Sequence, residues 1–318
     1  MRNSQFAPYH AASGPHTELA PHHSTLTAPK VTLAKHLSDN ILFVSSDDTK
    51  SVLAYDAETG DFLGKFARGG GLIEPEGIAF GPDGSLYVAS RSNEVLRYDG
   101  EKGNFEGVFA SGHGLVDPAG IAFGGPDNDL YVASGTNEEG PGGNQILRFD
   151  GRTGAFEAVL DPTNLAGLDD PEAIVFGPDG LLYVASTPEN GPGEVIRYDP
   201  ATNAFVDVFV SAADSHILDP TGMVFGPDGD LFLSSAATSE VMRYDGTTGA
   251  FEGVFVAAHS GGLNEAEGMA FGPNGNLFVA SELGNAVLEF DGTTGAFVSE
   301  FVVADSGHLS EPTFIMFG

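Results

Sequence analysis

The 318-residue sequence predicts an all-β fold, a six-bladed β-propeller of four-stranded antiparallel blades. One observation behind this prediction is an internal repeat, in which an apolar run ends in phenylalanine before glycine at intervals of 43, 53, 49, 46 and 46 residues. Such intervals are typical of one propeller blade. The other observation is that the chain ends on a fragment of a repeat whose missing strands stand near its start. The repeated phenylalanines are Phe80, Phe123, Phe176, Phe225, Phe271 and Phe317.

Each repeat contains four short apolar segments separated by turn residues. In the clearest copy we expect strands at residues 77–80, 86–90, 95–98 and 105–109. The first turn, Gly81-Pro82-Asp83-Gly84, has proline where φ is preset and glycine where φ is positive. No segment shows sustained helical periodicity. An aspartate follows the third strand in most repeats, and we expect it to cap the next turn rather than to bind a ligand.

The two ends of the chain predict how the ring closes. Residues 312–318 match a first strand with nothing after it, while residues 39–46, 51–55 and 62–66 match a second, third and fourth strand. We therefore expect the C-terminal strand to pair with the N-terminal blade. This pairing closes the ring and removes the unpaired sheet edges that an open array of blades would expose. The propeller is predicted over residues 39–318. Residues 1–38, with five of the nine histidines and several prolines, are predicted to be a flexible arm.

Composition excludes several classes of function. There are 13 Lys and Arg against 45 Asp and Glu, a formal net charge of −32, so no nucleic-acid partner is expected. Cysteine is absent, which excludes disulfides and thiol nucleophiles. No apolar run approaches the roughly 18 residues of a membrane helix, so no membrane insertion is expected, and no signal peptide is visible. Acidity without cysteine is compatible with an extracellular bacterial protein.

Carboxylates gather at one end of the predicted central channel. An acid precedes the first strand of every blade, and its recurrence predicts a structural role in accepting loop amide hydrogen bonds. Two residues later the pattern alternates, with glutamate in every second blade. Because the first strand is innermost, these glutamates are expected to surround the channel mouth on the face that carries the longer loops, here called the loop face. The alternating positions are Glu76, Ala119, Glu172, Thr221, Glu267 and Thr313.

A ring of three carboxylates requires compensation. Two carboxylates about 5 Å apart repel by roughly 3 kcal/mol at an effective dielectric constant of about 20. Three such pairs approach the whole stability of a domain, about 5–15 kcal/mol. The side chains therefore splay into water, keep protons, or bind a cation. For a cation, ligands Glu76, Glu172 and Glu267 predict a hard ion, Ca²⁺ before Mg²⁺.

Other positions on the loop face are candidates for binding or catalysis. Insertions at Gly135–Gln145 and Thr187–Glu194 predict either a wall that grips a protein or glycan partner or tolerated surface loops. Four histidines in loops between blades are candidate general bases or nitrogen ligands, or else they cap those loops. Four arginines share one slot of the third strand, and we expect them to pair with acids of neighbouring blades rather than to bind anions. These residues are His113, His216, His259 and His308, and Arg97, Arg148, Arg197 and Arg243.

The repeat resembles the NHL repeat and the related senescence-marker and gluconolactonase propellers across residues 39–318. It carries the Pro-x-Gly-Ile/Met-Ala/Val-Phe-Gly-Pro-Asp-Gly-x-Leu-Tyr/Phe-Val pattern. The resemblance implies a divalent metal at the channel mouth, held by a glutamate that Glu76 and Glu267 match. The asparagine and the proton-transferring aspartate of gluconolactonases are not matched, since Glu172, Ala119, Thr221 and Thr313 occupy those slots. The Gly-Pro-Asp-Gly-x-Leu units are also similar to those of streptogramin-type lyase propellers.

Two functions follow from these features. The first is a binding or assembly module, an acidic propeller stabilised by a cation that presents its loop face to a partner. The alternative is a metal-dependent hydrolase of lactonase type, or a lyase, with the three glutamates around the metal and a loop histidine as base. The absent aspartate favours the first.

Overall fold

A computed structural model describes residues 40–135, 143–188 and 191–318. The expectation of an arm at residues 1–38 lies outside the described residues. The described chain forms six four-stranded antiparallel sheets, as predicted. Its only other regular elements are the short 3-10 helices η2 (Ser260–Gly262) and η3 (Ser306–His308). Within these residues, no helix has the length and apolarity needed to cross a bilayer.

Each blade is numbered here from its innermost to its outermost strand. Blade 1 contains β24 (Pro312–Phe317), β1 (Ile41–Ser46), β2 (Ser51–Asp56) and β3 (Phe62–Arg68). Blade 2 contains β4 (Pro75–Phe80), β5 (Leu86–Ser90), β6 (Glu94–Tyr98) and β7 (Phe105–Ser111). Blade 3 contains β8 (Pro118–Gly124), β9 (Asp129–Ser134), β10 (Gln145–Phe149) and β11 (Phe156–Val159).

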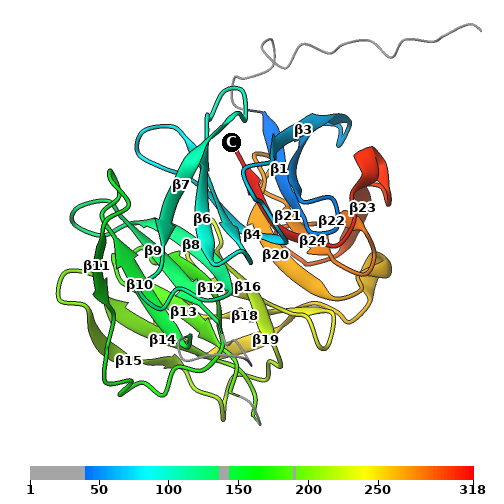
Figure 1. The fold of residues 1–318 in the computed structure, drawn as a ribbon. Helices are drawn as coiled ribbons and strands as arrows, with labels where there is room; N and C mark the ends of the chain where they lie inside the picture. The colour runs from blue at the N-terminus through cyan, green and yellow to red at the C-terminus, as the bar shows by residue number, and fades with distance from the viewer. Residues whose placement is uncertain (1–39, 136–142, 189–190) are drawn as a thin grey trace, which may run out of the picture. The chain divides into compact units, whose positions relative to one another are not determined.

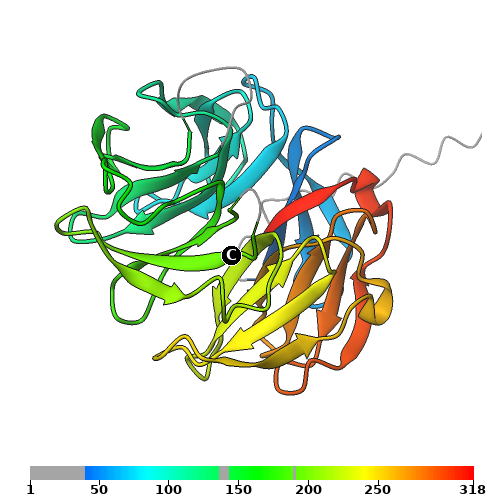
Figure 2. The same ribbon diagram turned by 90° about the horizontal axis from the view of Figure 1, so that it is seen from below.

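The remaining blades repeat this plan. Blade 4 contains β12 (Pro171–Phe176), β13 (Leu182–Ser186), β14 (Glu194–Asp199) and β15 (Ala204–Val210). Blade 5 contains β16 (Pro220–Phe225), β17 (Leu231–Ser235), β18 (Glu240–Tyr244) and β19 (Phe251–Val256). Blade 6 contains β20 (Ala266–Phe271), β21 (Leu277–Ser281), β22 (Ala286–Phe290) and β23 (Phe297–Val302). The sheets follow one another in chain order around the ring, from blue to red (Figure 2).

The ring closes as the sequence predicts. In Figure 1 the red C-terminal strand β24 lies beside the blue β1, and the two are antiparallel with Leu42 opposite Phe317. Beyond this pair, the Ile41 amide donates to the Gly318 carbonyl at 3.2 Å and the Gly318 amide donates to the Ile41 carbonyl at 3.0 Å. The last strand of the chain thus completes the first blade.

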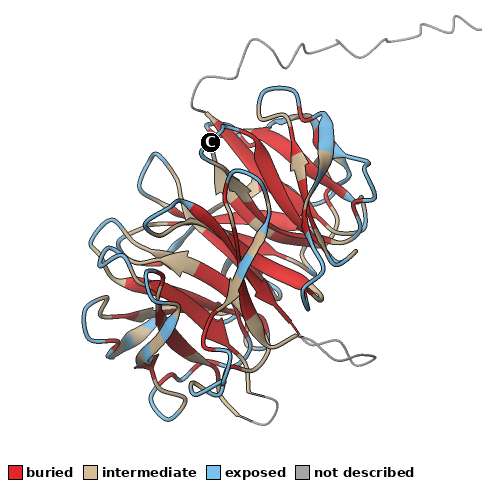
Figure 3. Ribbon diagram, turned by 60° about the vertical axis from the view of Figure 1, so that its left-hand side comes forward, coloured by how far each residue is buried: buried red, intermediate tan, exposed pale blue. Residues whose placement is uncertain are grey.

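The repeated phenylalanines join neighbouring blades. An aromatic residue on the second strand of each blade is almost wholly buried and packs edge-on against the phenylalanine that ends the first strand of the next blade. Tyr87 lies 4.7 Å from Phe123 between ring centroids, and across the closure Phe278 lies 5.0 Å from Phe317. Buried residues accordingly concentrate in the strands of the sheets, whereas exposed ones concentrate in the connections (Figure 3). The phenylalanine therefore repeats once per blade because each copy makes the same contact between neighbouring blades.

The innermost strands form the wall of the channel. Each of β4, β8, β12, β16, β20 and β24 contacts the next, and β24 contacts β4. Their approach is close, because a Cβ atom added at Gly222 would lie 2.6 Å from the Glu267 carbonyl oxygen. Side chains at the starts of these strands are therefore brought together at the channel mouth.

Candidate functional site

The three alternating glutamates stand at the second residue of β4, β12 and β20. Glu76 and Glu267 are 7% and 8% exposed, and Glu172 is partly buried. Burial raises the pKa of both Glu172 and Glu267 well above its usual value, and the negative charge of Glu76 raises both further. Burial also raises the pKa of Glu76 to about 8, although Arg91 opposes that shift. The three carboxyl groups are thus near enough to repel one another when ionised.

The other three positions of the ring are occupied differently. The Thr221 hydroxyl donates to the Ala266 carbonyl at 2.8 Å, and the Thr313 hydroxyl donates to the Pro75 carbonyl at 2.7 Å. Each threonine therefore ties its own blade to the next one. Ala119 is buried and carries no polar group. Two of the three non-acidic positions therefore join neighbouring blades by hydrogen bonds, whereas the three glutamates supply charge.

Arg91 is a residue of this site that the sequence reasoning missed. Its guanidinium lies 3.3 Å from the Glu76 carboxylate, 3.2 Å from that of Asp117 and 3.6 Å from that of Glu74. Arg91 is the first residue after β5, and it follows the serine that ends the strand. The available signal was a single basic residue at a position where the other blades have Asp47, Gly135, Thr187, Ala236 and Glu282.

Acids from that same position add to the cluster. Burial raises the pKa of Asp47 and of Glu282 to about 6, with neighbouring carboxylates as further causes. The Asp47 Oδ1 atom is buried and has no hydrogen-bond partner among the described residues. The charge of Asp47 contributes to raising the pKa of Glu282, and both acids contribute to raising the pKa of Glu76.

The six acids that precede the innermost strands share an unusual backbone conformation. Their φ values lie between 39° and 58°, in the left-handed region that few non-glycine residues adopt. The main chain of these residues contacts neighbouring loops: the Glu311 carbonyl accepts from the Asp47 amide at 3.2 Å, and the Glu311 amide donates to Asn285 Oδ1 at 2.8 Å. The role of the acidic side chains in accepting loop amides stays a prediction. The six residues are Glu74, Asp117, Asp170, Asp219, Glu265 and Glu311.

Together these groups make a strongly anionic mouth. Eleven carboxyl groups at the mouth act on one another through their charges, and the Arg91 guanidinium is the basic group among them. They are the three glutamates, the six acids before the innermost strands, Asp47 and Glu282. If all eleven carboxyl groups ionise, the formal charge of the mouth, with Arg91 included, is −10. Carboxylate oxygens are the donors that a hard divalent cation prefers, and the Asp47 Oδ1 atom is one that has no hydrogen-bond partner among the described residues.

The loop histidines lie apart from the glutamates. The ring of His113 stacks on Phe156 at 4.3 Å, and that of His216 tilts over Phe251 at 4.3 Å, so both cover outermost strands of the next blade. His259 Nδ1 lies 3.1 Å from the Leu263 carbonyl oxygen of its own loop. With His308, all four are exposed and have positive φ values between 56° and 68°. These contacts support the loop-capping interpretation.

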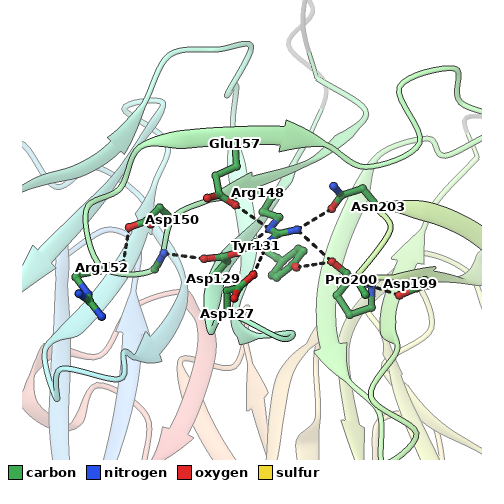
Figure 4. Close-up of polar contacts among 12 residues, drawn as sticks. Asp127, Asp129, Tyr131, Arg148, Asp150, Arg152, Glu157, Asp199, Pro200 and Asn203 are labelled. Carbon is green, nitrogen blue, oxygen red and sulfur yellow. Dashed lines mark hydrogen bonds and ion pairs between the residues drawn. The ribbon is translucent and has the colours of Figure 1, made fainter.

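The four arginines of the third strands pair with acids of their own blades, so the expectation of neighbouring-blade acids is wrong. Arg148 bonds Asp129 at 2.7 Å and Glu157 at 3.1 Å, and it also bonds the Pro200 carbonyl and the Asn203 amide oxygen of the neighbouring blade (Figure 4). Arg97, Arg197 and Arg243 likewise pair with Glu106, Asp207 and Glu252.

Two acidic clusters beside these arginines could also hold a metal ion. Ligand atoms of Asp129, Asp150 and Glu157 lie within 4.8 Å of one another, as do those of Asp230, Asp245 and Glu252. Each cluster already contains an arginine. Asp150 and Asp245 also cap turns, and hydrogen bonds from Thr153 and Thr248 lower the pKa of their carboxyl groups. The three channel glutamates do not form such a compact group in the described part of the chain.

The predicted wall of blades 3 and 4 falls partly outside the described residues. Of the two insertions, the structure describes Gly135, residues 143–145, Thr187, Pro188 and residues 191–194. Asn144 bridges the start of the next loop, since its side chain donates to Asp169 at 2.8 Å and accepts from the Asp170 amide at 2.8 Å.

Comparison with known proteins supports the fold. A family model described as strictosidine synthase-like, N-terminal, matches residues 65–98, too short a part of the chain to assign a family. No curated protein matches the sequence significantly.

Solved structures match over most of the chain. A chain of a nidogen/laminin complex is 17% identical, with a TM-score of 0.68 over 87% of this chain and 97% of that one. A Bacteroides caccae protein of unknown function is 15% identical, with a TM-score of 0.65 over 87% of this chain and 98% of that one. A putative gluconolactonase is 16% identical, with a TM-score of 0.57 over 71% of this chain and 77% of that one. These matches confirm the resemblance to gluconolactonase-like propellers at the level of the fold.

Proposed function

We propose that the protein is a binding or assembly module whose loop face is organised by a divalent cation at the channel mouth, with Ca²⁺ as the first candidate. The observation that carries this proposal is a channel mouth where eleven carboxyl groups act on one another's charge, while the Arg91 guanidinium pairs with three of them. A cation there relieves the repulsion among Glu76, Glu172 and Glu267, which otherwise requires bound protons. Calcium tolerates the irregular coordination that acids from several blades would offer.

A protein or glycan partner is proposed for the surface around this mouth. The propeller from the nidogen/laminin complex shares the fold at 17% identity and supports a protein partner by analogy only. The net charge of −32 favours a partner that presents basic groups. The insertions of blades 3 and 4 are the variable part of this face and are its proposed contact surface.

The cation is tested by thermal melting and titration calorimetry after treatment with a chelator. We expect saturating Ca²⁺ to raise the melting temperature by several degrees, because a ligand at about 100 times its Kd adds about 2.7 kcal/mol. Binding should release protons, so the heat of binding should depend on the ionisation enthalpy of the buffer. Glu172→Gln should abolish both effects, whereas Glu101→Gln in an exposed turn should not.

Arg91→Met sharpens this experiment. Removing the guanidinium from Glu76 and Asp117 leaves these carboxylates available to the ion, so affinity for Ca²⁺ should rise. An unchanged melt and no heat of binding in the wild type and in Arg91→Met would exclude a cation at the mouth.

A metal-dependent hydrolase or lyase is the second candidate, favoured by one specific observation. Burial beside Arg91 gives Glu76 a pKa of about 8, near the value suited to a general acid or base at neutral pH. The solved putative gluconolactonase has the same fold. In this reading Glu76 moves a proton, Glu172 and Glu267 help to hold a metal, and Arg91 orients an anionic or carbonyl group of the substrate.

Turnover of a lactone and ester panel in the presence of Ca²⁺ or Zn²⁺ tests this candidate. Hydrolysis that Glu172→Gln and Glu76→Gln both abolish, while His113→Ala leaves it unchanged, would establish the enzyme. We expect no turnover above background, because no aspartate occupies the alternating ring positions in the first strands.

A further inference from the structure

The third strands of four blades end in or near a tyrosine with a recurring role. In three blades its hydroxyl donates to a backbone carbonyl in the loop that arrives from the preceding blade. Tyr55 donates to Ser306 at 2.8 Å, and Tyr98 donates to Gly69 at 2.9 Å. Tyr244 donates in the same way to the carbonyl of the loop residue Ser215. The fourth such tyrosine is Tyr198 in blade 4.

Tyr198 lacks this partner. Its side chain is 1% exposed, yet within the described part of the chain we find no hydrogen-bond acceptor for its hydroxyl. Burial raises the pKa of Tyr198, and the charges of Asp161 and Glu194 raise it further, so the hydroxyl keeps its proton. The hydroxyl is not among the fully buried atoms that lack a partner, so it opens onto space beside the chain, where a bound molecule can accept its hydrogen bond.

The loop that reaches Tyr198 explains the missing acceptor. The outermost strand β11 has four residues, whereas the other outermost strands have six or seven. The following loop then bonds to itself: Asp161 Oδ2 accepts from the Ala166 amide at 3.0 Å, and Asn164 both accepts from the Leu168 amide at 2.7 Å and donates to its carbonyl at 3.2 Å. These contacts turn the loop in on itself and leave a hollow beside Tyr198.

That hollow is a cavity of about 190 Å³. This is about six times the volume of a water molecule in the liquid and well below the volume of a pocket for a drug-sized ligand. Its walls combine apolar and polar groups, and it shares no lining residue with the carboxylates of the channel mouth. The residues that line the cavity include Leu160, Leu168 and Pro162 on the apolar side, and Tyr198, Asp161 and Gln145 on the polar side.

We propose that this cavity binds a small neutral polyhydroxylated molecule, either a free polyol or the end of a sugar. A hydroxyl group both accepts a hydrogen bond, which Tyr198 needs, and donates one, which the Asp161 carboxylate can accept. An ammonium group cannot accept from Tyr198, and a carboxylate or phosphate would be repelled by Asp161. The apolar side of the cavity suits the C–H groups of a polyol.

Saturation-transfer NMR on the full chain tests the proposal with glycerol, xylitol and glucose as probes, and with propionate and propylammonium as charged controls. We expect saturation of at least one hydroxylated probe and of neither control. Tyr198→Phe should lower affinity at least tenfold, whereas Tyr98→Phe should bind as the wild type does. Transfer to xylitol or glycerol alone identifies a free polyol as the ligand, and transfer to glucose identifies a sugar end.

Melting separates a binding role for Tyr198 from a structural one. Tyr98→Phe loses a hydrogen bond to Gly69 and should melt lower by about 2 °C, whereas Tyr198→Phe loses none and should melt as the wild type does. The proposal is overturned if no hydroxylated probe shows transfer, if Tyr198→Phe binds as well as the wild type, if a charged control binds better, or if Tyr198→Phe melts lower.

Discussion

Deletion of residues 312–318 is expected to abolish cooperative unfolding. The deletion removes β24, so β1 loses its partner strand and the first and sixth blades lose the contact between Phe317 and Phe278. It also removes Ile315, which is 6% exposed in the hydrophobic cluster shared by these blades. The loss of one strand and its core contacts is comparable with the whole stability of a domain, about 5–15 kcal/mol. Circular dichroism during heating should show no sigmoidal transition, and size-exclusion chromatography should show aggregation through the open edges.

A deletion at the other end is the matched control. Removal of residues 1–38, which are predicted to lie outside the propeller, should leave the transition unchanged. Phe317→Ala is a milder test of the same contact and should cost about 3 kcal/mol, since it removes one edge-to-face pair but keeps the strand. If the chain without β24 melts within a few degrees of the full chain, the pairing of β24 with β1 does not stabilise the propeller.

The sequence pattern predicted the fold because the residues that repeat are the ones that pack between neighbouring blades. The phenylalanine before each glycine recurs because it meets the aromatic residue of the adjoining blade, as Tyr87 meets Phe123. The unfinished last repeat predicted the pairing of β24 with β1 because an open propeller would expose two sheet edges. Such regularities repeat in every blade, so a single sequence contains six copies of the same evidence.

The features that were missed occur once, and a repeat cannot reveal them. Arg91 stands at a position where no other blade has a basic residue. The pairing of β4 with β5 brings it to Glu76, and the ring brings it to Asp117 before the next blade. Tyr198 looks like Tyr98 in the sequence, and its hydroxyl has no acceptor among the described residues because the preceding loop takes another path. The pairing of the third-strand arginines within their own blades does recur, and it was missed for a different reason, because several acids can pair with an arginine such as Arg148.

Metal-free protein should become less stable as the pH is raised from 5 to 9. A carboxyl group whose pKa is higher in the folded state stabilises the fold fully below its unfolded pKa, and this stabilisation is lost as the pH rises through the folded pKa. For Glu76 the window runs from about 4.5 to about 8, and this group alone corresponds to at most on the order of 5 kcal/mol. Asp47 and Glu282, with pKa values of about 6, act in the same direction.

Glu267→Gln tests the origin of this slope. The groups that act on the pKa of Glu267 are other carboxyl groups, with Glu282 foremost after burial, so a neutral amide relieves repulsion without removing an ion pair. We expect the variant to melt several degrees above the wild type at pH 9 and close to it at pH 5, in thermal melts with a chelator present. Glu101→Gln in an exposed turn should keep the wild-type slope. A wild-type melting temperature that does not change with pH, or a Glu267→Gln protein that is less stable at pH 9, would show that the buried carboxyl groups are not held protonated by the fold.

Added Ca²⁺ should flatten the wild-type slope, because an ion that replaces the protons at the mouth stabilises the charged carboxylates where the free protein loses stability.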